Sequence, residues 1–278
     1  TMRSDANTYI YDYTNTCYTN HKDFTMKKVT LQGHKIEIYD SIDELPIVRF
    51  QIYNKYLLLD CGIGSDMESV DERLEKVYRY IKLKDLENLQ KEVCNLREAI
   101  YFVISEMSPR YMAFCCLVGS LDGKKIGDTA DDIRDVYEIL KSEKKKDIDD
   151  LLDAAKTKIC GELDLYFPSI FESTKTKEYY DLIKRKTTLT LDDIANGTNE
   201  NDDEIDRLTD KLLTFIKPQV YSGKNGAEVS YTKNFESICV ILSSNYNIQP
   251  KTMTTLAFYS AYELHTKEQD IKTKKRNG

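Results

Sequence analysis

The stretch 57-LLLDCGIGSDMES-69 decides how the first half of the chain is interpreted. An apolar run ends in an acid, and two glycines follow one residue apart. This order fits a phosphate-binding turn after a buried strand, in which glycine amides cradle the phosphate. It also fits a corner between two helices, because many helices end at a glycine in the left-handed conformation. The first interpretation predicts an enzyme, and the second predicts a helical building block.

Apolar residues on both sides of this stretch have helical spacing. Val48, Ile52, Tyr56 and Leu59 recur at intervals of 4, 4 and 3 residues before it, and similar intervals continue over 67–81 after it. A phosphate turn of this type needs a strand before it and alternating strand–helix units around it. We therefore expect the stretch to be a corner between helices.

The corner interpretation gives the residues of this stretch structural roles. Gly62 is expected to be the left-handed residue that ends the first helix, and Gly64 to turn the chain. Ser65 and Glu68 have the spacing of a capping box and are expected to begin the next helix, where Asp66 adds a favourable charge. A Gly62→Val change should then cost stability, because only glycine enters the left-handed region without strain.

Two further patterns predict helices. Ser41, Glu44 and Pro46 indicate a helix start before position 48. The most regular apolar stripe has intervals of 3 and 4 over three heptads and consists of Leu86, Leu89, Val93, Leu96, Ile100, Val103 and Met107. Such a stripe indicates either a helix inside an intramolecular bundle or a short coiled coil between subunits. We expect the intramolecular bundle.

The whole pattern predicts a mainly α fold, namely a helical bundle with an N-terminal extended arm and a short β-hairpin. The run 110–118 is apolar on all sides and is expected in the core, and Asp122-Gly123 after it predicts a turn. The predicted organisation is an arm at 1–26, a β-hairpin at 27–40 around Gly33, a helical bundle core at 41–190, an acidic loop at 191–204, and a C-terminal helical unit with a basic tail at 205–278.

The first 26 residues contain no Leu or Val, so they cannot form a core of their own. Their aromatic residues are Tyr9, Tyr11, Tyr13, Tyr18 and Phe24. The alternation of the first three tyrosines is typical of an extended chain with one apolar face. Because tyrosine is enriched in protein interfaces, we take these five residues as candidate contacts with a neighbouring subunit. The alternative is a disordered tail.

Composition excludes several classes of function. The chain has 278 residues, with 40 basic and 47 acidic side chains and a net charge of −7, which argues against a general nucleic-acid binder. No run approaches the roughly 20 apolar residues of a membrane span, so no membrane partner is expected. The run 119-GSLDGKK-125 has the wrong spacing for a P-loop.

No metal or cofactor site is predicted. The three histidines, His21, His34 and His265, are far apart, and no ligand spacing is present. The seven cysteines are not in CxxC spacing and are expected to be reduced and buried; they are Cys17, Cys61, Cys94, Cys115, Cys116, Cys160 and Cys239. We therefore expect no catalytic, cofactor-binding or metal-binding residues.

Five short motifs carry a resemblance to a known family. They are Tyr-Asp-Ser-Ile, Glu-Leu-Pro, Arg-Phe, Asn-Lys-Tyr-Leu-Leu and Asp-x-Gly-Ile-Gly-Ser-Asp, at 39–42, 44–46, 49–50, 54–58 and 60–66. With these motifs, 37–81 resembles the opening of structural proteins from crAss-like tailed phages of gut bacteria and from related prophages. A vaguer similarity covers 97–125 and 251–264, so that about half of the chain is included. The resemblance implies a virion protein, such as a ring or connector subunit of the neck or tail.

Our leading hypothesis is therefore a non-enzymatic virion subunit of a ring or connector at the head–tail junction or tail. Its expected partners are copies of itself in a cyclic oligomer and other virion proteins of the portal, neck or tail, and it would be assembled in the cytoplasm of the host bacterium. One alternative is a phosphate- or nucleotide-binding enzyme that uses the turn from Asp60 to Asp66. Another is a cytoplasmic phage or host interaction protein that is absent from virions.

Overall fold

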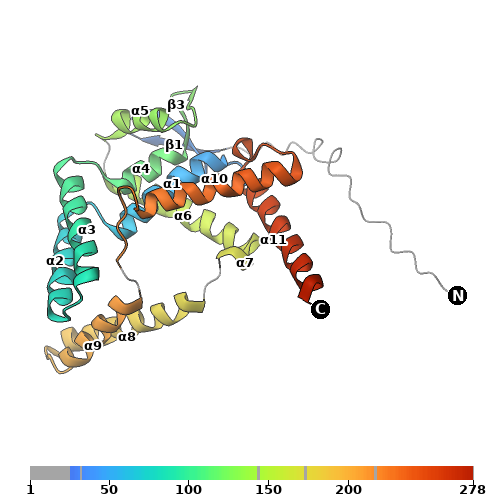
Figure 1. The fold of residues 1–278 in the computed structure, drawn as a ribbon. Helices are drawn as coiled ribbons and strands as arrows, with labels where there is room; N and C mark the ends of the chain where they lie inside the picture. The colour runs from blue at the N-terminus through green and yellow to red at the C-terminus, as the bar shows by residue number, and fades with distance from the viewer. Residues whose placement is uncertain (1–25, 32, 143–144, 172–173, 216–217, 278) are drawn as a thin grey trace.

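The computed structural model describes residues 26–31, 33–142, 145–171, 174–215 and 218–277 (Figure 1). The chain is mainly α-helical and carries a small antiparallel sheet near its N-terminus, which confirms the predicted fold class. Residues 1–25 lie outside the described part, and so do the five aromatic residues of the predicted arm.

The sheet has four strands in the order β1-β2-β3-β4. Strands β1 (Lys27–Leu31) and β2 (His34–Ile38) form the predicted hairpin. Strands β3 (Val118–Leu121) and β4 (Lys124–Lys125) form a second hairpin that was not predicted. Asp122 and Gly123, the predicted turn, join these strands with φ angles of 51° and 80°. Two successive positive φ angles fit a two-residue hairpin loop.

Helices α1 (Ile47–Gly62) and α4 (Pro109–Leu117) pack against each other at the centre of the molecule (Figure 1). Every residue of α4 except Arg110 is buried, as the apolar run at 110–118 predicts. Helices α5 (Ala130–Leu140) and α6 (Lys145–Tyr166) pack on α4 and complete this part of the core.

The predicted helix start before position 48, next to Pro46, is confirmed, but the capping box of Ser41 and Glu44 is wrong. Helix α1 begins only at Ile47, after Pro46. The hydroxyl of Ser41 instead donates to the carboxylate of Glu162 on α6, at 2.8 and 2.9 Å, and the same carboxylate accepts from the Ile42 amide at 2.8 Å. The Ser41 side chain therefore bonds to a residue 121 positions away in the sequence and does not cap a helix.

A buried arginine joins α1 to the sheet. Arg49 has no exposed surface, and its Nε donates to the carboxylate of Asp128 at 2.6 Å. Its other guanidinium nitrogens donate to four backbone carbonyls, those of Cys116, Val118, Ile126 and Gly127. The guanidinium also lies 5.6 Å from the ring centre of Tyr39. All hydrogen-bonding capacity of this cation is used inside the protein, as a buried charge requires.

Helices α7 (Pro168–Phe171), α8 (Thr174–Asn196) and α9 (Asp202–Phe215) follow α6 along the chain. The predicted acidic loop at 191–204 is wrong at both ends, because its first six residues belong to α8 and its last three to α9. Gly197, with φ +64°, ends α8. The acids at 191–204 are thus mostly helical residues on either side of a short turn.

The last helices are α10 (Ala227–Tyr246), the 3-10 helix η1 (Pro250–Thr252), which was not predicted, and α11 (Thr255–Asn277). They do not form a separate core. Phe235, Leu242 and Phe258 belong to the main core together with α1 and α4. The predicted basic tail at the C-terminal end of this unit belongs to α11 as far as residue 277.

Candidate functional site

The quoted stretch forms a corner between α1 and α2 (Met67–Lys82), as predicted. The residue in the left-handed conformation is Gly64, with φ +77°, and the assignment of that role to Gly62 is wrong. Gly62 is instead the last residue of α1, and the amides of Ile63 and Gly64 both donate to the carbonyl of Leu59, at 2.7 and 3.2 Å. Helix α1 therefore ends two residues later than the glycine pattern suggests.

The cap of α2 is also shifted. Asp66 is the N-cap residue, and its carboxylate accepts from the Ser69 amide at 2.9 Å. The predicted capping box of Ser65 and Glu68 is wrong, and Ser65 donates to the hydroxyl of Ser108 at 3.3 Å. Aspartate caps a helix as well as serine does, so the next residue could take over the role.

Gly62 is required for a different reason from the one predicted. A Cβ atom at this position would overlap the ring of Tyr221, which lies against the end of α1. The ring belongs to the smaller of two apolar clusters, whose buried members are Leu59, Ile63, Val70, Ala99 and Phe102. Gly62 thus allows the segment before α10 to pack onto the corner.

Gly62→Ala is expected to lower the free energy of unfolding by about 1–3 kcal/mol, because the added methyl group overpacks this contact. Chemical denaturation followed by circular dichroism measures the change. Gly161→Ala is the matched control, since a Cβ there meets open space within a helix and should be neutral or stabilising. The Tyr221→Ala background should remove most of the cost of Gly62→Ala. An equal loss in both backgrounds would contradict the packing explanation.

The acid of the quoted stretch lies in a cluster of ion pairs. Arg110 on α4 contacts Asp149 at 2.6 Å and Asp153 at 2.7 Å, both on α6, and Asp60 on α1 at 3.6 Å. Burial raises the pKa of the Asp60 carboxyl, and the Arg110 guanidinium opposes this shift. Asp60 thus helps to hold three helices together. Because α1 is a helix, the strand that precedes a phosphate-binding turn is not formed.

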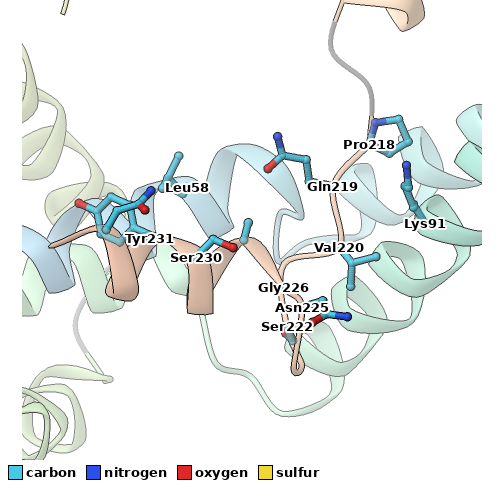
Figure 2. A pocket seen from close by; sticks show the side chains of 12 residues that line it. Leu58, Lys91, Pro218, Gln219, Val220, Ser222, Asn225, Gly226, Ser230 and Tyr231 are labelled. Carbon is cyan, nitrogen blue, oxygen red and sulfur yellow. The ribbon is translucent and has the colours of Figure 1, made fainter. Parts of the chain in front are cut away.

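A groove of about 670 Å³ lies between α1, α3 and the segment that leads into α10 (Figure 2). Figure 2 shows Lys91 and Pro218 at one end and Leu58 and Tyr231 at the other, so the polar groups do not converge on one point. The first amides of α10 are already bonded to backbone carbonyls, at 2.8 and 3.1 Å. The amides of Ala227 and Glu228 are therefore already occupied by acceptors of the chain itself.

Metal ligands, membrane-spanning helices and the burial of the cysteines were also considered in the sequence. Among the described residues, no group of His, Cys, Asp and Glu side chains is placed to hold a metal ion. No described helix has both the length and the apolar character to cross a bilayer. Cys115, Cys116 and Cys239 are buried as expected, whereas the expectation is wrong for the exposed cysteines, Cys61, Cys94 and Cys160.

Helices α2 and α3 (Leu86–Ile104) form an antiparallel hairpin that projects at one end of the molecule (Figure 1). Its inner side is held by a buried ion pair, in which Arg73 Nη1 donates to Glu92 Oε1 at 2.6 Å. The same guanidinium donates to the carbonyls of Gly62 and Ile63 at the end of α1. Arg73 therefore fixes both helices of the hairpin to the corner.

The inside of the hairpin combines polar with apolar side chains, and large apolar side chains are also exposed on its outside. The buried residues of α3 include Asn88, Glu92 and Asn95, and the last two are each 1 % exposed. Eight large apolar side chains are instead between 38 and 76 % exposed; they are Met67, Leu74, Tyr78 and Ile81 on α2, and Leu86, Val93, Ile100 and Ile104 on α3. We call these eight residues the outer face.

Both halves of the outer face point to the same side of the hairpin. Intervals of 3, 4 and 7 place the exposed residues of each helix on one helical face. Viewed along each helix from its N-terminus, a half-buried residue lies on the same flank of the exposed residues. It is Val77 on α2 and Leu96 on α3. Because the two helices are antiparallel, equal flanks place both exposed faces on one side of the hairpin.

The expectation that the regular stripe packs inside a bundle is therefore wrong for Leu86, Val93 and Ile100. The other members of the stripe, Leu89, Leu96, Val103 and Met107, are half-buried. Hydrophobic spacing identified the helix and its stripe, but it could not indicate whether another element of the chain covers the stripe. The alternative of a coiled coil between subunits remains a prediction.

Comparison with known proteins adds no relative. No protein-family model matches the chain, and no curated protein or solved structure is significantly similar to it. Among the described residues, the outer face gathers eight exposed large apolar side chains, and exposed apolar patches mark interaction sites on proteins.

Proposed function

We propose that the chain is a non-enzymatic structural subunit of a tailed-phage virion, in a ring or connector at the head–tail junction or tail. The observation that carries the proposal is the outer face of the α2–α3 hairpin. Eight large apolar side chains are exposed there on helices that a buried ion pair holds in place. A rigid apolar face of this kind is typical of a surface that a partner covers in an assembly.

The resemblance to crAss-like phage structural proteins supports the same proposal through residues with structural roles. Its motifs include Arg49, which joins α1 to the sheet, and Gly62, which contacts Tyr221. They also include Gly64 in the left-handed conformation and Asp66 at the start of α2. Arg49 thus stabilises the core, and the other three residues build the corner that orients the hairpin, so the similarity concerns architecture rather than chemistry.

Mass spectrometry of purified virions tests the proposal. We expect the chain to be present in multiple copies per particle in virions of the phage that encodes it. A non-structural protein of the same phage, absent from the particles, serves as the control for contamination. Absence of the chain from pure virions would contradict the proposal and favour a cytoplasmic interaction protein instead.

The nucleotide-binding enzyme is a weaker alternative. It needs Asp60 to be available to a metal ion or a water molecule, whereas Asp60 lies beside Arg110 in a cluster of ion pairs. It also needs a strand before the turn, and that segment is α1.

The predicted aromatic arm would provide further subunit contacts, and that role stays a prediction because it falls on residues 1–25.

A further inference from the structure

We propose that the outer face of the α2–α3 hairpin binds the same face of a second copy, so that the two hairpins form a four-helix bundle. This pairing rests on the proposed function, because it names the partner of the face assigned to assembly. The position of the exposed side chains along the hairpin supports a second copy as the occupant.

Exposed apolar residues of α2 and α3 lie at matching levels. The turn between the helices is flanked by one such residue on each side, and the next ones follow at intervals of one heptad on both helices. From the turn outward, the levels are Ile81 with Leu86, Leu74 with Val93, and Met67 with Ile100. A heptad corresponds to about two helical turns, so each level carries one apolar side chain from each helix.

A twofold axis parallel to the helices makes this face complementary to itself. It places α2 of one copy over α3 of the other at the same level, so that Leu74 faces Val93 of the second copy. Neighbouring helices then run antiparallel throughout, as in an up-down-up-down bundle. Heptad spacing of the stripe suits such packing, in which side chains of one helix fill the gaps of the next.

Two charged residues within the face favour this axis. Asp71 and Arg97 are exposed and lie at one level, between those of Leu74 and Met67. The axis parallel to the helices places each acid against the base of the other copy. A twofold axis perpendicular to the helices would place them against Tyr78 and Gln90, which are uncharged. Complementary charges thus specify one register of the pair.

The size of the face also suits a second copy. Taking on the order of 200 Å² for a large side chain, the eight exposed side chains offer roughly 900 Å². A standard interface buries about 800 Å² per partner. The pair is isologous, so it does not close a cyclic ring by itself. In a ring, it would join copies that belong to two layers.

Disulfide crosslinking of the full chain tests the arrangement. Serine first replaces the exposed cysteines, Cys61, Cys94 and Cys160. It also replaces Cys17, which lies outside the described residues. Leu74→Cys and Val93→Cys are then introduced separately, with Val240→Cys on α10 as an exposed control outside the face. We expect a mixture of the first two variants to give at least fivefold more covalent dimer than either variant alone or the control. Circular dichroism checks that each variant keeps its helical content.

Other results would overturn the pairing in distinguishable ways. Crosslinking of Leu74→Cys with itself would indicate the perpendicular axis. Failure of the mixture to crosslink, in a chain that is oligomeric by mass, would reject the hairpin pair and leave the proposed assembly role intact. A chain that is monomeric would count against both. As a second readout, Asp71→Arg and Arg97→Asp should each raise the dissociation constant about tenfold, and the double exchange should restore it.

Discussion

Arg49→Leu is expected to lower the free energy of unfolding by about 3–5 kcal/mol, because each buried carbonyl that loses its donor costs about 1–3 kcal/mol. The leucine fills much of the volume but leaves the carbonyls of Cys116, Val118, Ile126 and Gly127 without their donor. Asp128 is half-exposed and can return to water, so most of the loss comes from the buried carbonyls.

Urea denaturation of Arg49→Leu beside the unchanged protein measures this loss. Arg134→Leu is the control, because that arginine is exposed and its only carboxylate contact among the described residues is at 4.0 Å. It should change stability by less than about 0.5 kcal/mol. If Arg49→Leu were as mild as this control, Arg49 would not be the residue that joins α1 to the sheet.

Arg73→Leu is the second change with a large expected effect. It leaves the carboxylate of Glu92, which is 1 % exposed, without its partner inside the hairpin. It also removes the donor to the carbonyls at the end of α1. An uncompensated buried charge costs about 3–5 kcal/mol, and the cost should fall on the α2–α3 hairpin.

Hydrogen exchange followed by mass spectrometry locates the effect. Arg73→Leu should speed exchange in 67–104 while leaving α4 protected. The double change Arg73→Leu and Glu92→Leu should recover much of the protection, because a buried ion pair can be replaced by apolar residues of similar size. If the double variant were no better than the single one, the isolated charge would not be the cause of the loss.

The sequence predicted the elements whose signals are local. The β-hairpin at 27–40 and the helices on both sides of the corner follow from apolar spacing and glycine positions. The second hairpin was missed because its strands have only four and two residues. The cap at Ser65 was misplaced by one residue because Asp66 competes for the same role.

Long-range partners explain the other differences. Nothing near Ser41 in the sequence indicates that Glu162 will bind it, and nothing near Arg49 indicates that its acceptors follow 67 to 79 residues later. The outer face is the same kind of case. Its heptads could be read from the sequence, but their exposure depends on which other helices the fold brings beside them.

The solution mass of the full chain tests the central claim most directly. Sedimentation equilibrium at micromolar concentrations should show an oligomer of paired copies. Val93→Glu should shift it toward the monomer, because the change places a charge in the outer face, while Val240→Glu on the exposed side of α10 should not. A monomer at every concentration, or an oligomer that Val93→Glu leaves unchanged, would contradict assembly through this face.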